Sequence, residues 1–339
     1  MRVTIREVAS TAGVHYGTVS RALNPDTAHL VAKKTRERVQ KVADELGYTP
    51  NTIARGLKKN RTQTVGVVVP DIASPVIGHL VRGVEDRLSP HGYIALVANT
   101  DDDREREQTQ IRALMGRSVD GLIVASAHLS GPTLEELAEH RIPVVHANRH
   151  GHGESIASVT SDDAPGVYSV VDHLVRLGHR RIAYLGGPLD TSTGQTRSQA
   201  FRFAMAEKNL AVDEKLVVHA KTFRTKEGEQ LAAALLAAGE EFTAIVAGND
   251  MLAIGCLDTL RTHHIACPDD ISVVGFNDMP FVDKLSPPLT SVKVPHYDIG
   301  TEAAALMLQL MHAEASSPRT VLLPVALVVR ESTGAAQVP

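Results

Sequence analysis

Residues 16–21 place small, hydroxyl and basic side chains on a predicted short helix. Val19 and Leu23 lie one turn apart and can bury against a preceding helix, which leaves the other positions facing outward. The outward positions are Tyr16, Gly17, Ser20 and Arg21. Such a face suits the major groove of DNA, where arginine bonds guanine and hydroxyls bond phosphates. The alternative is an ordinary helical hairpin in a core, because two short helices joined at a glycine are common.

A second set of chemistry-bearing side chains follows the predicted strands of the rest of the chain. The set comprises residues 71–77, Asn148, Arg149, Thr193, Arg197, Phe223, Asn249, Asp250, Asn277 and Asp278. Carboxamides, carboxylates and arginines together offer the donors and acceptors that a polyhydroxyl ligand needs. Asn and Asp after strands can equally be turn residues, and Asp250 and Asp278 could cap the following helices. Both interpretations stay open on the sequence alone.

The first set lies in a predicted three-helix unit. Thr4 can cap the first helix, and Glu7 can complete a capping box three residues later. Gly13 provides the turn, because glycine tolerates a positive φ, and a second helix is expected over residues 16–23. A third helix is expected over residues 35–46, with an apolar stripe and Gly47 as its end.

Residues 50–57 can form one more short helix beginning at Pro50 and Asn51. Only about two turns precede the polar run 58–64, and so short a helix is marginal alone because nucleation is costly. Gly56 weakens it further, since glycine is a poor helix former.

From residue 64 the pattern alternates apolar strands with helices. Strands are expected at 65–70, 93–98, 121–126 and 142–147, and helices at 76–87, 105–115 and 134–140. The order restarts at 181–188, with a helix at 199–208 and strands at 243–250 and 271–278. This alternation predicts two similar doubly wound halves, each a parallel sheet with helices on both faces. Ligands of such sheets bind beyond the carboxyl ends of the strands.

The charge of the chain is unevenly distributed. Residues 1–61 contain 12 Lys and Arg against 5 Asp and Glu, a net charge of +7. The whole chain carries −4, so the remaining residues carry −11. A basic head on an acidic body is expected of a DNA-binding module joined to a separate domain.

Length and composition exclude several classes of protein. A chain of 339 residues with 43% hydrophobic residues is expected to form two or three globular units. No apolar run is long enough for a transmembrane helix, and no secretory signal is evident, so no membrane partner is expected. Cys256 and Cys267 have no metal-ligand spacing and indicate a reducing compartment, which predicts a cytoplasmic protein.

The sequence does not favour an enzyme. Asp and His occur near strand ends, but no catalytic triad, metal-ligand spacing or phosphate loop accompanies them, and no cofactor or metal is expected. The His-Gly-His-Gly run at 150–153 is interpreted as a polar loop, because no acidic partner lies at a helical offset. A transport-type binding protein is a third class, but a basic helical head would serve no purpose in it.

The block VTIREVASTAGVHYGTVSRALN at 3–24, followed by KTRERVQKVADELGYTPNTIARGLKK at 34–59, resembles the DNA-binding headpiece of the LacI/GalR family of bacterial transcription repressors. The resemblance continues to about Gly334. It implies an N-terminal three-helix helix-turn-helix domain and a hinge helix. An α/β two-lobed, periplasmic-binding-protein-like core with doubly wound parallel sheets would follow them.

The predicted domain boundaries combine this resemblance with the strand and helix pattern. Residues 1–49 form the helix-turn-helix domain, and residues 50–62 form the hinge helix and linker. The N-terminal lobe of the core comprises residues 63–160 with 292–320, and the C-terminal lobe comprises 161–291 with 321–339.

The head supplies the expected DNA contacts. Tyr16 and Arg21 are predicted to contact bases, and Thr18 and Ser20 to hold phosphates. Relatives often place a base-reading side chain where Gly17 stands, so His15 and Tyr16 would serve that end of the half-site. By resemblance, Leu57 inserts into the minor groove. The full predicted set is Thr4, His15, Tyr16, Gly17, Thr18, Ser20, Arg21, Asn24, Asn51, Ala54, Arg55, Leu57 and Lys58.

The resemblance also assigns a small-molecule effector to the core. It implies effector contacts from Asn148, Arg197, Asn249 and Asn277, and stacking by Phe223. The predicted set further includes Asp71, Val76, Ile77, Arg149, Thr193, Asp250 and Asp278. Many relatives carry two aromatics just after the first strand, whereas this chain has Ser-Pro-Val-Ile at 74–77. A sugar or sugar derivative is the expected effector; the alternative is a corepressor-dependent regulator of nucleotide or central metabolism with a non-sugar effector.

The expected partners are double-stranded operator DNA, the effector and a second copy of the chain. One small reading head contacts too little DNA for useful specificity, so a homodimer on a pseudo-palindromic operator is predicted. By resemblance, the acidic body supplies the dimer interface. No heptad tail precedes Pro339, which favours a dimer over a tetramer.

Overall fold

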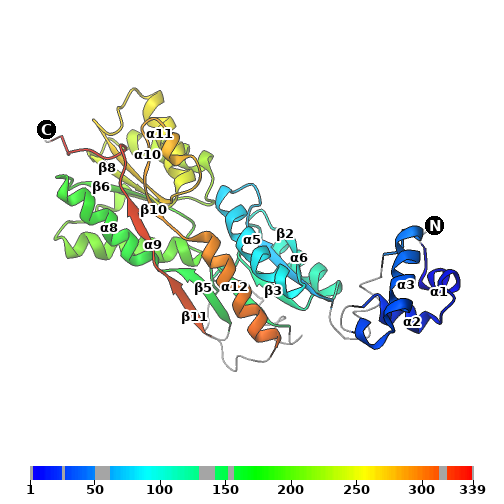
Figure 1. The fold of residues 1–339 in the computed structure, drawn as a ribbon. Helices are drawn as coiled ribbons and strands as arrows, with labels where there is room; N and C mark the ends of the chain where they lie inside the picture. The colour runs from blue at the N-terminus through cyan, green and yellow to red at the C-terminus, as the bar shows by residue number, and fades with distance from the viewer. Residues whose placement is uncertain are drawn as a thin grey trace. The chain divides into compact units, whose positions relative to one another are not determined.

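The computed structural model describes residues 3–24, 27–49, 62–129, 142–151, 156–312 and 319–337. The chain divides into two compact units, residues 1–62 and residues 63–339, which we call the head and the body (Figure 1). The predicted hinge helix at 50–57 and the predicted helix at 134–140 lie outside the described residues. No helix of the described ranges is long and apolar enough to cross a membrane.

The head contains the three predicted helices, α1 (Ile5–Ala12), α2 (Tyr16–Ala22) and α3 (Lys33–Leu46). The capping box at Thr4 and Glu7 is confirmed, because each residue bonds the backbone of the other. Gly13 ends α1 with a φ of 61° and Gly47 ends α3 with a φ of 67°, so both are left-handed as glycine allows. The short helix η1 (Ala28–Leu30) lies between α2 and α3.

The helices of the head close around one small core. Its buried side chains are Val8, Ala9, Ala12, Val19, Ala22, Val39, Val42 and Ala43. α3 begins two residues earlier than predicted, and its N-cap residue Ala32 makes no side-chain cap bond. Helix α3 is therefore held by its buried stripe rather than by a cap.

The body contains two six-stranded sheets (Figure 1). The first has the order β11-β5-β4-β3-β1-β2, and each neighbouring pair is parallel. Its strands are β1 (Thr64–Val69), β2 (Ile94–Asn99), β3 (Gly121–Val124), β4 (Val144–Ala147), β5 (Ala157–Ser161) and β11 (Thr320–Leu323). Its helices are α5 (Pro75–Leu88), α6 (Arg104–Gly116) and α12 (His296–Met311), with η2 (Ser89–His91) after α5.

The second sheet has the order β12-β10-β9-β8-β6-β7 and is parallel except for the pair β10 and β12. Its strands are β6 (Ile182–Gly186), β7 (Val217–His219), β8 (Ala244–Ala247), β9 (Ser272–Asn277), β10 (Thr290–Lys293) and β12 (Ala326–Val328). Its helices are α8 (Asp163–Arg176), α9 (Ser192–Glu207), α10 (Thr225–Ala237) and α11 (Asp250–Thr262), with η3 (Glu214–Leu216) and η4 (Val282–Lys284). The two doubly wound halves are confirmed.

Two predicted lobe boundaries need correction. The boundary at 292 would divide β10, whereas all of that strand pairs within the second sheet. The boundary at 321 would place most of β11 in the second half, whereas the strand pairs with β5 in the first sheet. Pairing partners across a sheet decide these memberships, and short apolar strands carry no local signal of which sheet they join. The chain therefore crosses between lobes after β5, after β10 and after β11.

The two faces of the first sheet are covered by different helices. Val67 and Ile123 belong to the core cluster that includes α5 and α12, whereas Val68 and Leu122 belong to the cluster that includes α6. Adjacent strand residues point to opposite faces, so this division is that of a sheet with helices on both sides. Because both faces of the sheet are covered, the strands are nearly continuous apolar runs and do not alternate apolar with polar residues.

Close helix packing in each lobe depends on glycine. An added Cβ on Gly300 of α12 would lie 2.0 Å from the carbonyl oxygen of Leu80 in α5. In the second lobe, an added Cβ on Gly255 of α11 would lie 2.1 Å from the carbonyl oxygen of Thr225 at the start of α10. These contacts bring helix backbones close together and fix where α10 begins.

Asp250 organises the polar layer at the end of the second sheet. Its carboxylate accepts bonds from the hydroxyl of Ser291 at 2.5 Å and from the amide of Met279 at 2.8 Å. Gly275 leaves room for it, since an added Cβ there would lie 2.3 Å from the nearer Asp250 oxygen. Burial raises the pKa of Asp250 to about 7, although these two hydrogen bonds act to lower it.

Replacing Val39 by Ala is expected to destabilise the head by about 2 kcal/mol, because its fully buried methyl groups pack between all three helices. Amide hydrogen exchange of α1–α3 in the full chain should accelerate. Lys41→Ala on the exposed side of α3 is the control and should leave the exchange rates nearly unchanged. Equal rates for Val39→Ala and the unmodified protein would contradict this account of the head's core.

Replacing Asp250 by Asn is expected to change how the stability of the body depends on pH. The folded-state pKa of Asp250 is raised, so its contribution is greatest below the unfolded value of 3.8 and is lost as the pH rises through about 7. Asn does not titrate. The stability of the variant relative to the unmodified protein, measured by urea unfolding, should therefore increase with pH up to about 7 and then level off. A difference that stays constant across this range would refute the raised pKa.

Candidate functional site

The exposed face of α2 carries the side chains predicted to contact DNA. Tyr16 is 53% exposed, and Ser20 and Arg21 are exposed, while Val19 is fully buried against the other helices. Thr18 is half-buried, and α2 contains no acidic residue. The face therefore offers a phenol, hydroxyls and a guanidinium with no carboxylate on the helix to repel a phosphate.

His15 has a structural role that the sequence did not indicate. Its Nδ1 accepts a hydrogen bond of 3.1 Å from the amide of Gly17, so the imidazole caps α2. The His15 and Tyr16 rings lie 4.1 Å apart between centroids. The cap fixes the His15 ring and holds it against Tyr16, the one aromatic residue of α2.

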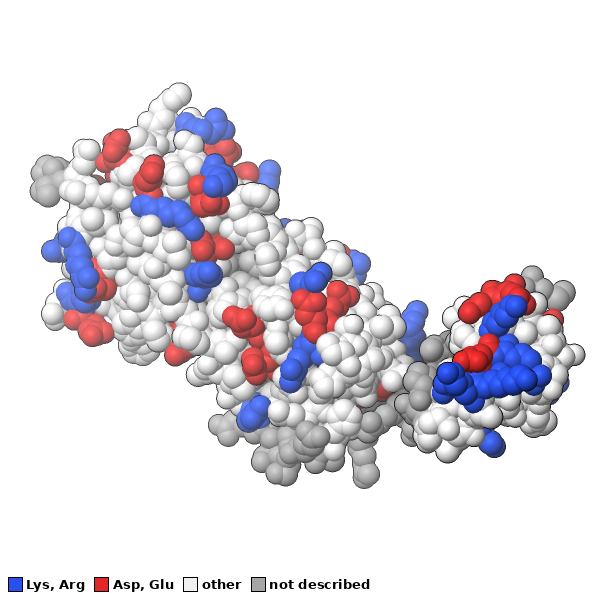
Figure 2. Space-filling view, in the orientation of Figure 1, with Lys and Arg blue, Asp and Glu red and all other residues white. Residues whose placement is uncertain are grey.

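Basic side chains gather on the visible face of the head (Figure 2). Lys33 and Glu37 of α3 lie 4.0 Å apart and Lys41 and Glu45 lie 3.8 Å apart, all with exposed side chains. Such exposed pairs hold their charges only weakly, so the lysines stay available to an anionic partner. The predicted contacts Asn51, Ala54, Arg55, Leu57 and Lys58 lie outside the described residues. Thr4 is used by the capping box, and Asn24 is half-buried directly after α2.

The body contains a cavity of about 390 Å³ lined by residues of both lobes. Most of the predicted effector residues line it: Asp71, Val76, Ile77, Asn148, Arg149, Thr193, Arg197, Phe223, Asn249 and Asn277. The cavity lies where the strands of both sheets end and the following helices begin, as expected for doubly wound sheets. Neither Asp250 nor Asp278 belongs to its lining.

Asp250 and Asp278 instead make contacts with other residues of the body. Asp250 bonds Ser291 and Met279, and Asp278 lies 2.7 Å from a guanidinium nitrogen of Arg330. Neither is the N-cap of the helix that follows it. The N-cap of α11 is Asn249, whose Oδ1 accepts a 2.9 Å bond from the amide of Leu252, and the N-cap of η4 is Phe281. Adjacent positions after a strand point in different directions, so the sequence alone did not separate the lining residue from its neighbour.

Two lining asparagines have backbone conformations that favour their residue type. Asn148 follows β4 with a φ of 65°, and Asn277 ends β9 with a φ of 117°. Asparagine tolerates positive φ better than most residues. Asn148 and Asn277 are therefore turn residues and also line the cavity. The turn directs each side chain away from its strand.

Arg197 is held rigidly in the wall of the cavity. It is 3% exposed, and its Nε donates to Asp163 at 2.7 Å while one terminal nitrogen donates to the carbonyl of Gly248 at 2.8 Å. Its guanidinium carbon lies 3.7 Å from the centroid of the Phe276 ring. A buried ion pair of this kind is geometrically specific, and removing one partner would leave a buried unpaired charge.

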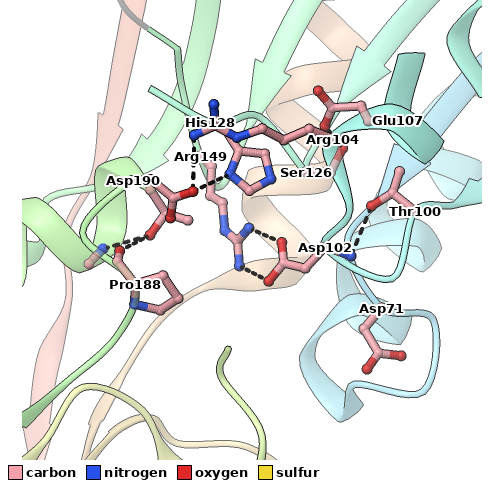
Figure 3. A network of polar contacts seen from close by, with 12 residues as sticks. Asp71, Thr100, Asp102, Arg104, Glu107, Ser126, His128, Arg149, Pro188 and Asp190 are labelled. Carbon is pink, nitrogen blue, oxygen red and sulfur yellow. Dashed lines mark hydrogen bonds and ion pairs between the residues drawn. The ribbon is translucent and has the colours of Figure 1, made fainter. Parts of the chain in front are cut away.

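Arg149 forms a second buried ion pair in the cavity wall (Figure 3). Its two terminal nitrogens lie 2.6 and 3.4 Å from the two carboxylate oxygens of Asp102, and its guanidinium lies 5.4 Å from the Phe223 ring. Burial acts to raise the pKa of Asp102, but the charge and hydrogen bonds of Arg149, together with His128 and Arg224, hold it below its ordinary value. Asp102 therefore stays ionised, and Arg149 is fixed with its aromatic neighbour at the cavity.

Contacts to Asp190 join the two lobes beside this pair (Figure 3). The Asp190 carboxylate in the second lobe lies 3.0 Å from Arg104 and 3.3 Å from the Nδ1 of His128, both in the first lobe. The Asp190 carbonyl also accepts a 2.8 Å bond from the amide of Leu129. Burial lowers the pKa of His128, against the attraction of Asp102 and Asp190. One second-lobe residue thus binds three first-lobe residues.

Several lining residues were not predicted from the sequence. They are Pro70, Asp102, Thr222, Arg224, Thr225, Lys226, Met251, Met279 and His296. Thr222–Lys226 lead into α10, a helix absent from the predicted pattern, although the nearby Phe223 was identified. Burial lowers the pKa of His296 to about 3, with Arg197 adding to the effect, so its imidazole is neutral at physiological pH.

Metal-ligand groups and activated thiols are two features that a catalytic site could use. Within the described residues, no group of three or more His, Cys, Asp or Glu could hold a metal ion. Burial raises the pKa of both thiols, that of Cys267 to about 12, so neither is an activated nucleophile. The cavity contains ion pairs and amides that suit binding.

Two family models match the chain. The model for bacterial regulatory proteins of the lacI family matches residues 4–51, and the model for periplasmic binding protein-like domains matches residues 171–333. The first match covers the described helices of the head. The second covers most of the second lobe and continues through α12.

Similar proteins cover nearly the whole chain. The HTH-type transcriptional regulator DegA of Bacillus subtilis (strain 168) is 34% identical over 336 residues, which are 98% of each chain. A lac repressor dimer bound to operator and the anti-inducer ONPF matches with a TM-score of 0.87 and 28% identity over 99% of this chain and 100% of that one. A complex of the transcriptional regulator CelR with cellobiose matches with a TM-score of 0.75 and 32% identity over 98% and 100%. The chain belongs to the lacI family of bacterial regulatory proteins and is a DNA-binding transcriptional regulator, not an enzyme.

Proposed function

We propose that this regulator is a repressor that binds a pseudo-palindromic operator as a homodimer and is controlled by a small polar effector. The observation that carries the proposal is the cavity between the lobes, lined by polar side chains from both of them, in a chain that also has a DNA-binding head. A ligand that contacts both lobes can favour one arrangement of the lobes over another.

The dimer is inferred from the size of the reading head. The head presents one short helix, and a single module of this kind contacts too little DNA for useful specificity. Two heads on two half-sites double the contact and require a two-fold symmetric operator. The lac repressor in the similar solved structure is a dimer bound to operator, which supports the same arrangement here.

A sugar or sugar derivative is the effector class that the lining supports. The cavity offers amides from Asn148, Asn249 and Asn277, a hydroxyl from Thr193 and the ring of Phe223. Amides and hydroxyls suit a polyhydroxyl ligand, and an aromatic ring suits the flat face of a sugar or base. CelR, which is similar over nearly the whole chain, was solved with cellobiose.

Control follows from a difference in effector affinity between the DNA-bound and free protein. Such a coupling is typically about 1–3 kcal/mol and is reciprocal. Residues 50–57 connect the head to the lobes, and a short helix there would be lost easily once its partner copy moved away. Induction by the effector is the proposed direction; a corepressor would use the same cavity with the opposite sign.

Replacing Arg21 by Ala is expected to remove guanine preference at one position of each half-site, worth roughly 1–3 kcal/mol of discrimination. Binding-site selection followed by mobility-shift titration measures this preference. Arg38→Ala on α3 is the control, because Arg38 is exposed but does not lie on α2. An Arg21→Ala protein with unchanged sequence preference would refute the assignment of α2 as the reading helix.

Replacing Arg197 by Lys is expected to weaken the effector response at least about tenfold without changing operator affinity in the absence of effector. Lysine keeps a positive charge beside Asp163, whereas Ala would leave that buried carboxylate unpaired and confound the result. Effectors would first be found by a thermal-shift screen of sugars, sugar phosphates and nucleobases, and the hits titrated calorimetrically.

The matched control for this experiment is Arg202→Lys on the same helix. Arg202 pairs with Glu214 and does not line the cavity. Its replacement should leave the response intact. If Arg197→Lys also responds normally to the effector, the cavity is not the control site.

A further inference from the structure

We propose that the effector is an anion, and that its phosphate or carboxylate group binds at the start of α10 between Arg224 and Lys226. The inference rests on the proposed function, because it concerns the same cavity, and it specifies the chemical class of the ligand. Four features of the cavity carry it: unpaired helix amides, buried donors without protein partners, the balance of lining charges, and the rigidity of α10.

The first turn of α10 faces the cavity with its amides unused. The N-cap residue is Arg224, which makes no side-chain cap bond, and Arg224, Thr225 and Lys226 all line the cavity. Within the described residues, the amides of Thr225 and Lys226 have no hydrogen-bond acceptor. The start of a helix carries a partial positive charge, and its free amides are donors that an anion can satisfy.

Two deeply buried side chains also present unused donors to the same space. Thr193 is 7% exposed and lines the cavity, and its hydroxyl has no hydrogen-bond partner among the described residues. Arg197 is 3% exposed, and only its Nε and one terminal nitrogen have acceptors in the described part of the chain. Neither donor is among the fully enclosed unpaired atoms of the described residues, so both open to the cavity, where a ligand can accept from them.

The cationic side chains that line the cavity outnumber the anionic ones. The lining cations are Arg149, Arg197, Arg224 and Lys226, and the lining carboxylates are Asp71 and Asp102. Asp102 is engaged by both terminal nitrogens of Arg149. Asp71 accepts from the amide of Ala73 at 2.9 Å and lies 3.7 Å from Arg224. Lys226 has no ion-pair partner among the described residues, so a positive charge is left at the cavity.

Asn249 adds a further donor because its amide orientation is fixed. Its Oδ1 accepts from Leu252, so the amino group of the side chain is left for the cavity. The hydroxyls of a neutral sugar both donate and accept, whereas an ionised phosphate or carboxylate group of a ligand brings mainly acceptors. The Asn148 and Asn277 amides can both donate and accept, but the carboxylates of the wall are engaged while its helix amides, its Lys226 and the Asn249 amino group only donate. This balance favours an anionic ligand.

The start of α10 is held in place before any ligand binds. Gly228 of α10 and Gly255 of α11 let the two helices meet, and an added Cβ at either position would lie 2.3 Å or less from backbone of the other helix. Because these amides do not need to reorganise, their interaction with an anion is not offset by the cost of ordering them. Phosphates and carboxylates share this acceptor chemistry, so the experiment includes both.

Matched pairs of ligands test the proposal on the full-length protein. Glucose would be compared with glucose 6-phosphate and gluconate, and ribose with ribose 5-phosphate, by thermal shift and then calorimetric titration; inorganic phosphate alone is a further probe. We expect an anionic member to bind at least about tenfold more tightly than its neutral partner. Its affinity should fall as salt is raised, because Lys226 and Arg224 are partly exposed.

Lys226→Gln and Arg224→Gln should each reduce that affinity about tenfold or more while leaving the melting temperature of the free protein nearly unchanged. Lys221→Gln is the matched control, since Lys221 is exposed on the same segment but does not line the cavity. The loss should be confined to the anionic ligands. A phosphate-specific or a carboxylate-specific response identifies which group the site prefers, and either supports the proposal.

The proposal fails if a neutral sugar binds as tightly as its anionic partner, if no anion of the panel binds, or if Lys226→Gln and Lys221→Gln behave alike. Such a failure is distinct from failure of the proposed function. If a neutral sugar binds, Arg197→Lys weakens it and operator affinity responds, the cavity is still the control site and only the charge of the effector has been wrongly inferred.

Discussion

Parallel pairing of strands is the constraint on which the rest of the body depends. Parallel neighbours require a crossover for each strand, and every crossover helix then begins at the same edge of its sheet. In this chain the first residues of α5, α9, α10, α11 and α12 all contribute to one cavity. The topology of the sheets thus places helix amides and strand-end asparagines at one cavity, whatever ligand the side chains favour.

The buried pair of Arg197 and Asp163 connects this cavity to the route of the chain between lobes. Asp163 begins α8 directly after the chain leaves β5, the last strand it forms in the first sheet before its first crossing. His296 begins α12 directly after the second crossing and also lines the cavity. A ligand in contact with Arg197 and His296 would thus lie beside two of the segments that connect the lobes. On the proposed mechanism, this is where a small molecule can most directly bias their arrangement.

The head could be predicted from the sequence almost completely, because its signals are local. The capping box at Thr4, the left-handed Gly13 and the stripe through Val39 depend only on neighbours within a few residues. Two parallel sheets were predicted correctly, but the predicted boundaries placed most of β11 in the wrong lobe and divided β10. Strand pairing depends on contacts between residues far apart in the sequence, which local patterns do not show. The strand β5 and the helices α8 and α10 were not predicted. Because α10 was missed, Arg224 and Lys226 were not identified as cavity residues. The sequence did not separate Asp250 and Asp278, which bond other residues of the body, from their neighbours Asn249 and Asn277, which line the cavity, because they are adjacent along a turn.

Both partners proposed for this protein are anions, and this has a consequence for how its control works. Raising the ionic strength weakens DNA binding by the basic head, because counterions released into a more concentrated salt solution gain less free energy. It also weakens anion binding at the cavity by screening. The two affinities therefore move in the same direction when salt changes. The coupling between them is a difference in effector affinity between DNA-bound and free protein, and the screening of the cavity is common to both states. We therefore expect ionic strength to change the amounts of operator and effector bound much more than the sign or size of the coupling between them. The coupling depends on the arrangement of the lobes.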